Sequence, residues 1–338
     1  MSLEREHNKV ATTPNAATPT DFTVNPRSLL RRWTGADEIA HLITLIAAAT
    51  ILLITVLLVY QLWVLSAEAR AKFGWNFFVT KTWDPVAGDF GALPFIYGTL
   101  VTSAVALLIA VPLGVGAAIF LAELAPPRLS SSLTFVSDLL AAVPSVIYGL
   151  LGVFLLVPLM RTTVQPALKE TLGFLPFFQG PAYGIGFLTA GIVLSIMIVP
   201  FVLSVSREVL LAIPRDQREA ALALGATKWE STWKVVVPGA RIGIFGSVFL
   251  ALARALGETM AVTMVVGNNP RIAASLFSPG YSIAAVLANE FSEATGNLYL
   301  SALIELGLVL FLLTFVLNGL ARLLILVTTA RGSGVLPT

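Results

Sequence analysis

Residues 181–206 read PAYGIGFLTAGIVLSIMIVPFVLSVS and contain no Asp, Glu, Lys or Arg. About 20 predominantly apolar residues are enough for a helix to cross the hydrocarbon core of a bilayer. Pro200 lies inside the stretch, but membrane-spanning helices tolerate proline. The composition of this segment therefore predicts a transmembrane helix.

The remainder of the chain has the same apolar character. Of the 338 residues in the whole chain, 57% are hydrophobic and 12% are charged. A soluble domain could not bury this much apolar surface. We expect an all-α membrane protein whose permease domain covers residues 39–328. Its six transmembrane helices are expected at about 42–67, 97–122, 139–160, 181–206, 242–267 and 298–321.

The distribution of Lys and Arg predicts the orientation. If six spans alternate, 14 of the 21 cationic residues fall on one side of the membrane and six on the other. The side richer in Lys and Arg is normally cytoplasmic, so both termini are expected inside. We interpret residues 1–38 as a largely disordered tail, not a signal peptide, and 329–338 as a short second tail. Within the first tail, 27–33 (RSLLRRW) fits either an amphipathic surface helix or a basic stop before the first span.

Several kinds of chemistry are not expected. The chain has no Cys and two His, His7 and His41, both near its N-terminus, so we expect no metal site. It has no GxxxxGK[ST] phosphate-binding loop and no candidate nucleophile beside a base, so we expect neither catalytic residues nor a cofactor.

The outer loops and the interrupted spans leave alternatives open. Loop 68–96 contains Trp75 and Trp83, which suit either a docking surface for an external partner or an interfacial aromatic belt. Prolines and glycines inside the second, third and fourth spans fit either broken helices along a pathway or ordinary kinks and close helix packing.

The most informative polar stretch is 212–238, AIPRDQREAALALGATKWESTWKVVVP. Pro214 suits the first turn of a short helix, and Gly225 suits its C-terminal cap. Thr227 and Glu230 have the spacing of a capping box, which predicts the start of a second helix. A helix-turn-helix of this kind could press a small apolar ridge into a groove of a soluble partner.

This stretch resembles the cytoplasmic loop of permease subunits of ATP-binding-cassette (ABC) importers. In that family Glu-Ala-Ala, Gly and Ile-x-Leu-Pro recur at fixed spacings. Here the corresponding residues are Glu219, Ala220, Ala221, Gly225, Val235, Val237 and Pro238. The resemblance implies a type I importer permease fold, in which this loop is the coupling helix that docks on the ATPase. It assigns the ATPase-coupling role to Glu219, Ala220, Ala221 and Gly225.

A closer resemblance extends over roughly residues 75–325 and leaves out the tail 1–26. It rests on four stretches: PFIYGTLVTS (94–103), AAVPSVIYG (141–149), RALGETMAV (254–262) and LANEF (287–291). Together they are similar to the PstC family of bacterial phosphate-importer permeases. The resemblance implies a bacterial inner membrane, a PstA-like permease as heterodimer partner, a PstB-like ATPase dimer and a PstS-like phosphate-binding protein outside.

Arg254 and Glu258 raise a separate question, because ionised side chains are costly inside a membrane. Their spacing of four residues predicts one polar helix face shared with Thr259. We hypothesise that Arg254 is a transient phosphate ligand, since its fork of donors matches two phosphate oxygens. Glu258 would orient Arg254, neutralise it when no anion is present, and disfavour sulfate, which lacks the proton of hydrogen phosphate.

Further predictions and alternatives concern the same pathway. Ser145 and Tyr148, beside Pro144, are weaker candidates for hydroxyls that line it. A structural ion pair, with Arg254 bonded to Glu258, to Glu305 or to a partner subunit, would equally explain the charges. The competing functions are an ABC permease for another oxyanion, such as sulfate or molybdate, and an ion-coupled secondary transporter. The role of Glu305 stays open.

Overall fold

The computed structural model describes residues 36–332, with side chains from Ala40 to Leu323. The segment 27–33 and most of the two predicted tails lie outside the described residues. The chain divides into two compact units, 1–58 and 59–338, and each is described by itself.

The described part of the first unit belongs to helix α2, Ala36–Leu65. Its apolar side chains are exposed, with Ile51 and Leu52 more than two-thirds accessible. The hydroxyl of Thr55 donates to the carbonyl oxygen of Ile51 at 2.9 Å, so this polar group is satisfied inside the helix. Both features suit a helix in contact with lipid, where a helix must satisfy its own polar groups.

The second unit is built almost entirely from helices. Its elements are α3 (Ala67–Phe73), α4 (Asn76–Val79), β1 (Trp83–Asp84), β2 (Asp89–Phe90), α5 (Leu93–Ile119), η1 (Phe120–Leu124), α6 (Pro127–Ala141), α7 (Ser145–Leu151), η2 (Gly152–Leu156), α8 (Val157–Leu159), η3 (Met160–Val164), α9 (Gln165–Leu172), η4 (Pro176–Phe178), α10 (Phe187–Leu211), α11 (Arg215–Ala223), α12 (Lys228–Ser231), η5 (Thr232–Val236), α13 (Val237–Leu256), α14 (Met260–Val266), α15 (Ile283–Glu290) and α16 (Asn297–Gly332). Among the described residues, six helical stretches are long and apolar enough to cross a membrane. The predicted all-α fold with six spans is confirmed.

The core of this unit surrounds α10, which packs against α5, α6, α13 and α14. Leu194, Ile198 and Val202 of α10 are completely buried. Ser206 of α10 and Ser247 of α13 are also buried, and their hydroxyl oxygens lie 2.7 Å apart. Helix α10, which contains most of the apolar stretch 181–206, is thus the central helix of the unit.

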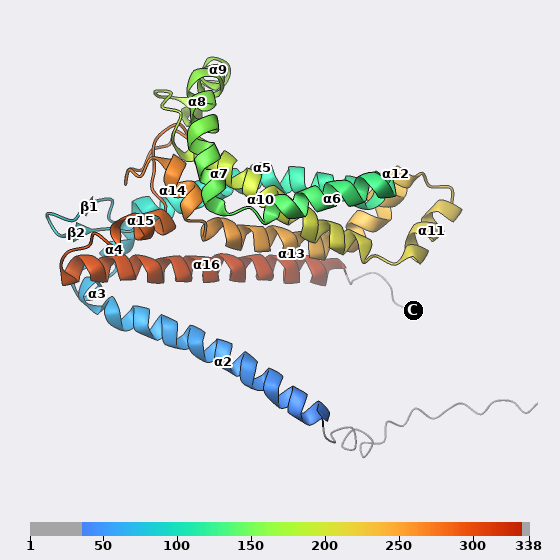
Figure 1. The fold of residues 1–338 in the computed structure, drawn as a ribbon, viewed down its shortest axis with the longest axis horizontal. Helices are drawn as coiled ribbons and strands as arrows, with labels where there is room; N and C mark the ends of the chain where they lie inside the picture. The colour runs from blue at the N-terminus through green and yellow to red at the C-terminus, as the bar shows by residue number, and fades with distance from the viewer. Residues whose placement is uncertain (1–35, 333–338) are drawn as a thin grey trace, which may run out of the picture. The chain divides into compact units, whose positions relative to one another are not determined.

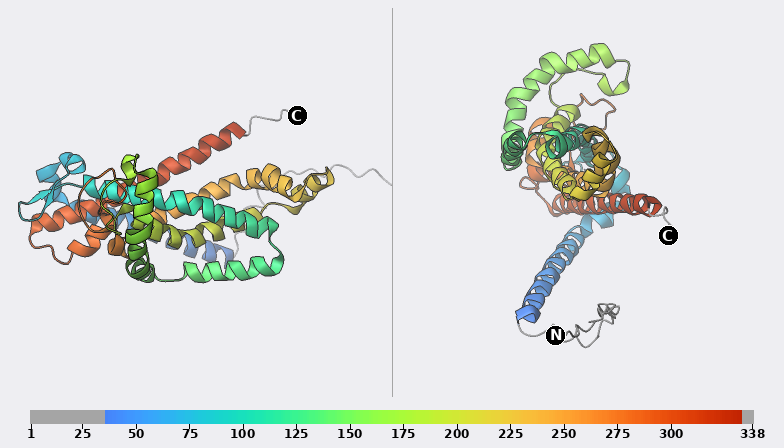
Figure 2. Two further views of the ribbon diagram at one scale, coloured as in Figure 1. Left: turned by 90° about the horizontal axis from the view of Figure 1, so that it is seen from above. Right: turned by 90° about the vertical axis from the view of Figure 1, so that its right-hand side faces the viewer.

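Different secondary-structure elements lie at the two ends of the unit (Figure 1). At one end lie α3, α4, the β1–β2 hairpin and α15, and at the other end lie α11 and α12. The segment α7–α9 runs across the direction of α5, α10 and α13, which is also visible when the molecule is turned (Figure 2).

The loop expected at 68–96 is folded. Trp83 pairs with Phe90 across the hairpin, and its ring lies 4.8 Å from those of Phe90 and Phe95. The Trp83 indole also donates to the carboxylate of Glu290 at 2.8 Å. Trp83 therefore belongs to an aromatic cluster, whereas Trp75 is 86% exposed and suits an interfacial position.

Two expected spans are interrupted in the structure. The third stretch, expected at 139–160, divides at Ala142–Pro144 between α6 and α7. The fifth, expected at 242–267, divides at Gly257–Thr259 between α13 and α14. Hydropathy does not distinguish a broken helix from a continuous one, because both can be equally apolar.

Candidate substrate pathway and coupling loop

The break in the fifth span separates the two charges that the sequence placed on one helix face. Arg254 lies in the last turn of α13, while Glu258 lies after its end and before the start of α14. A carboxylate oxygen of Glu258 accepts a hydrogen bond from the amide of Ala261 at 3.2 Å. Arg254 and Glu258 thus occupy the ends of two half-helices and do not share a continuous helix face, which corrects that expectation.

Each charge is placed favourably at its own helix end. A cation is stabilised near a helix C-terminus and an anion near an N-terminus, and this is how Arg254 and Glu258 are distributed. Within the described part of the chain, the salt bridges join Arg218 with Glu123 and Lys234 with Glu230, so Arg254 and Glu258 are not paired with one another. The Arg254 side chain is exposed in this single chain, and its guanidinium can meet an anion.

The break in the third span lies close to the same place. Its second half, α7, packs against α14. The contact is tight, because a methyl group added to Gly149 would lie 2.5 Å from the sulfur of Met264 and 3.2 Å from Cα of Ala261. The guanidinium of Arg254 lies near enough to the hydroxyl of Tyr148 to interact with it electrostatically. Two broken spans therefore meet beside Arg254.

The other predicted pathway residues take the following positions. Tyr148 is 7% exposed, and its hydroxyl donates to the carbonyl oxygen of Leu140 at 2.7 Å across the α6–α7 break. Ser145 is the first residue of α7 and is half-buried. Thr259 precedes α14, and its hydroxyl donates to the carbonyl oxygen of Gly257 at 3.3 Å.

The turn between the two helices of the 212–238 loop has the local structure that the sequence predicts. The second helix does not end within the loop, because α12 continues through η5 into α13 and the fifth span begins at Lys228. Helix α11 ends at Ala223, and Gly225 then adopts a φ of 87°, a conformation that favours glycine. The capping box of Thr227 and Glu230 is present, with both of its hydrogen bonds. These interactions are local, so sequence spacing was sufficient to predict them.

Much of the surface of α11 is exposed. Glu219, Ala220 and Gly225 are exposed, and Ala221 is half-buried. Leu224, just after the helix, is 90% exposed. Leu222 and Trp229 are exposed as well, so this part of the loop presents several apolar side chains to its surroundings.

Sequence reasoning missed the ion pair that holds α11 in place. Arg218 bonds Glu123 of η1 at 2.8 Å, and their side chains are 18% and 11% exposed. Arg218 also donates to the carbonyl oxygens of Leu210, at 2.7 Å, and of Ile213. The sequence contains an acidic residue, Glu123, at the end of the second span and a basic loop after the fourth. No spacing rule predicts that residues 95 positions apart form an ion pair.

This architecture is that of the membrane subunit of a type I ABC importer. In a solved example, a crystal structure of a bacterial alginate ABC transporter in complex with an alginate pentasaccharide-bound periplasmic protein, one chain matches 87% of this chain and 94% of its own length. That match has a TM-score of 0.54 at 16% sequence identity. The chain belongs to the family of binding-protein-dependent transport system inner membrane components, whose pattern matches residues 110–325.

Membership of this family makes the chain a multi-pass inner membrane protein and a transport subunit, not an enzyme. Subunits of this kind work with an ATPase and a substrate-binding protein.

Relatives of known name are similar over most of the chain. The phosphate transport system permease protein PstC of Mesorhizobium japonicum is 47% identical over 306 residues, which are 89% of this chain and 94% of that protein. PstC of Haemophilus influenzae is 50% identical over 264 residues, 77% of this chain and 84% of that protein. A probable PstC of Methanocaldococcus jannaschii is 38% identical over 302 residues, 88% of this chain and 94% of that protein.

Proposed function

We propose that this chain is the permease subunit of an ATP-driven importer of inorganic phosphate and works by alternating access. The observation that carries the proposal is the similarity to PstC of Mesorhizobium japonicum over 89% of the chain. The proposed assembly contains a PstA-like second permease, a PstB-like ATPase dimer and a PstS-like phosphate-binding protein. Both termini lie in the cytoplasm, in agreement with the distribution of Lys and Arg.

Arg254 is proposed to bind phosphate transiently on its way across the membrane. Its position at the end of a half-helix supports this role, because discontinuous spans are typical of substrate sites in transporters. A guanidinium offers two parallel donors to a phosphate anion. The guanidinium of Arg254 is accessible, and among the described residues it forms no salt bridge.

Glu258 is proposed to select the protonated form of the anion. Its carboxylate caps α14, and one of its oxygens can also accept a hydrogen bond from the proton of hydrogen phosphate. Sulfate has no such proton near neutral pH, so the carboxylate repels it without a compensating bond. Thr259, Ser145 and Tyr148 are proposed to contribute hydroxyls to the same pathway.

The exposed face of α11 is proposed to transmit ATP hydrolysis to the spans. Glu219, Ala220 and Ala221 would contact the ATPase, and Gly225 would form the turn that presents them. The bond between Arg218 and Glu123 supports this role, because a rigidly attached helix can transfer a displacement to the spans.

Uptake of labelled phosphate by cells that contain this chain and its partner subunits tests the proposal. Depletion of ATP is expected to stop uptake, while collapse of the proton gradient at constant ATP and a large excess of sulfate are expected to leave it unchanged. Loss of uptake on collapse of the gradient would instead indicate an ion-coupled transporter. Competition by sulfate would indicate a permease for another oxyanion.

A further inference from the structure

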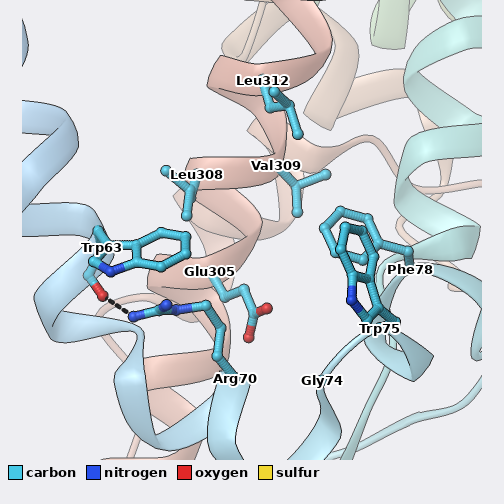
Figure 3. Close-up of a pocket in the computed structure, with 9 residues that line it drawn as sticks. All are labelled: Trp63, Arg70, Gly74, Trp75, Phe78, Glu305, Leu308, Val309 and Leu312. Atoms are coloured by element: carbon cyan, nitrogen blue, oxygen red, sulfur yellow. Dashed lines mark hydrogen bonds between the residues drawn. The ribbon is translucent and has the colours of Figure 1, made fainter.

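A pocket of about 300 Å³ lies between the last span and the segment formed by the last turn of α2 together with α3 and α4, and Arg254 is not among the residues that line it. Trp63 and Arg70 form one wall, Trp75 and Phe78 form the opposite wall, and α16 forms the floor (Figure 3). All of these residues belong to the second compact unit.

The pocket contains a buried carboxylate without a partner. Glu305 is 2% exposed, and its side chain points into the space between the two walls (Figure 3). Among the described residues, its Oε2 atom has no hydrogen-bond partner. A buried polar group without a partner is costly, and such a group inside a pocket suggests a ligand that supplies a hydrogen-bond donor.

Arg70 places a cation at the same pocket. Its guanidinium lies over the ring of Trp63, 3.5 Å from the ring centre, and donates to the backbone oxygen of Trp63 and to Ser66 Oγ. It interacts electrostatically with Glu305, but the two do not form a salt bridge within the described chain. A guanidinium has more N–H donors than these two bonds use, so Arg70 can also bind an anionic group.

The rest of the pocket is apolar and follows the last span. Glu305 lies about 12 Å along α16 from Asn297, and Leu312 lies about 10 Å further on, at 1.5 Å per residue. Leu308, Val309 and Leu312 line this part of the pocket. Trp63 and Trp75 belong to a residue type that gathers where a bilayer meets water. The pocket thus has a polar end framed by Trp side chains and an apolar track that continues along a membrane span.

We propose that this pocket binds a phospholipid whose headgroup carries a primary ammonium, such as phosphatidylethanolamine. The ammonium donates to the carboxylate of Glu305, the phosphate accepts from the guanidinium of Arg70, and one acyl chain lies along Leu308–Leu312. This occupant supplies a donor to the carboxylate, an acceptor to the cation and an apolar tail to the track.

Other common lipids match the pocket less well. A choline headgroup has a positive charge but no N–H donor, so the carboxylate would remain without a hydrogen bond. A glycerol headgroup leaves the lipid with a net negative charge, which Glu305 opposes. The proposal therefore predicts a preference among headgroups and not a general affinity for lipid.

The test is native mass spectrometry of the purified complex that contains the full chain. It is equilibrated with equal amounts of phosphatidylethanolamine, phosphatidylcholine and phosphatidylglycerol of identical acyl composition. Phosphatidylethanolamine is expected to be retained roughly tenfold over the other two, as loss of one charge-assisted hydrogen bond implies. Glu305→Gln is expected to abolish this preference.

Glu293→Gln is the matched control, because Glu293 is an exposed carboxylate near the start of the same helix. Arg161→Gln, at another exposed cation, is the control for Arg70→Gln, which is expected to weaken retention of all three lipids. Equal retention of the three headgroups by the unaltered protein would overturn the proposal, and this comparison needs no variant. A headgroup preference unchanged by Glu305→Gln would also overturn the proposal. Retention of no lipid at all would overturn it too, and would indicate that a helix of another subunit fills the pocket.

Discussion

Single residues in this chain are placed by helix ends as much as by helix faces. Arg254 and Glu258 are four positions apart, but the break at Gly257–Thr259 gives each of them its own half-helix. The negative end of α13 stabilises the cation, and the positive end of α14 stabilises the carboxylate. Neither charge depends on the other for its stabilisation, as the proposed role of Arg254 as a transient ligand requires.

Replacement of Arg254 by Gln tests its role as a ligand. Loss of its charge-assisted hydrogen bonds is expected to lower phosphate uptake by roughly tenfold or more, while the complex assembles and still hydrolyses ATP. Arg254→Lys is expected to be intermediate, because it keeps the charge and loses the planar fork. Uptake and ATP hydrolysis, measured in parallel on the same preparation, distinguish these outcomes. Failure of Arg254→Gln to assemble would instead indicate a structural ion pair with a partner subunit.

The sequence predicted the type of each pathway residue but not its surroundings. That Arg254 and Glu258 are unusual follows from their position in an apolar stretch. Sequence spacing could not show that the helix breaks between them. Nor could it show that Tyr148, from a different span, lies within electrostatic range of Arg254, because their separation depends on how distant helices such as α7 and α14 pack.

At the scale of elements, two close contacts determine the geometry of the site and of the loop. The first is the crossing of α7 and α14, where Gly149 allows the two helices to approach. The second is the ion pair of Arg218 and Glu123, which attaches α11 to the end of the second span. Both join segments that lie about a hundred residues apart in the sequence.

Gly149→Ala is expected to separate α7 from α14, because the added methyl group would lie 3.2 Å from the backbone Cα of Ala261 and would also displace the Met264 side chain. Overpacking of this kind costs about 1–3 kcal/mol, which a lower unfolding temperature of the purified complex and reduced uptake would report. Gly246→Ala is the control, since a methyl group there meets nothing within 4 Å. Equal behaviour of the two variants would show that the close approach is unimportant.

Arg218→Ala is expected to loosen α11. The change leaves a largely buried Glu123 carboxylate without its cation, at a cost of about 1–3 kcal/mol. The amides of 212–224 should then exchange with solvent roughly tenfold or more faster, since local opening governs exchange. Arg215→Ala, at an exposed neighbour on the same helix, should change exchange little. Unaltered exchange in Arg218→Ala would contradict the anchoring role.

At the scale of the whole molecule, the two ends of the second unit are built from different elements. The end formed by α3, α4, the β1–β2 hairpin and α15 is folded around aromatic side chains. Helix α11, most of whose residues are exposed, lies at the opposite end (Figure 1). We propose that the first end meets the binding protein outside and the second meets the ATPase inside, so that a change at one end reaches the other through the broken spans.

Cysteine labelling tests this orientation cleanly, because the chain contains no Cys of its own. Val86→Cys and Leu224→Cys replace side chains that are 98% and 90% exposed, at opposite ends. A membrane-impermeant maleimide added to spheroplasts is expected to label Val86→Cys, and to label Leu224→Cys only after permeabilisation. The reverse pattern would invert the topology and contradict the cytoplasmic placement of α11.

The sequence by itself determined the number of spans, the glycine turn after α11 and the capping box at the start of α12. These properties depend on the length of apolar stretches and on hydrogen bonds between near neighbours. The tertiary structure decided where the third and fifth spans break, that Arg218 finds Glu123, and that Glu305 lies in a pocket with Arg70. Each of these depends on which distant surfaces pack together, because a contact between remote segments is set by the fit of whole helices and leaves no local pattern in the chain.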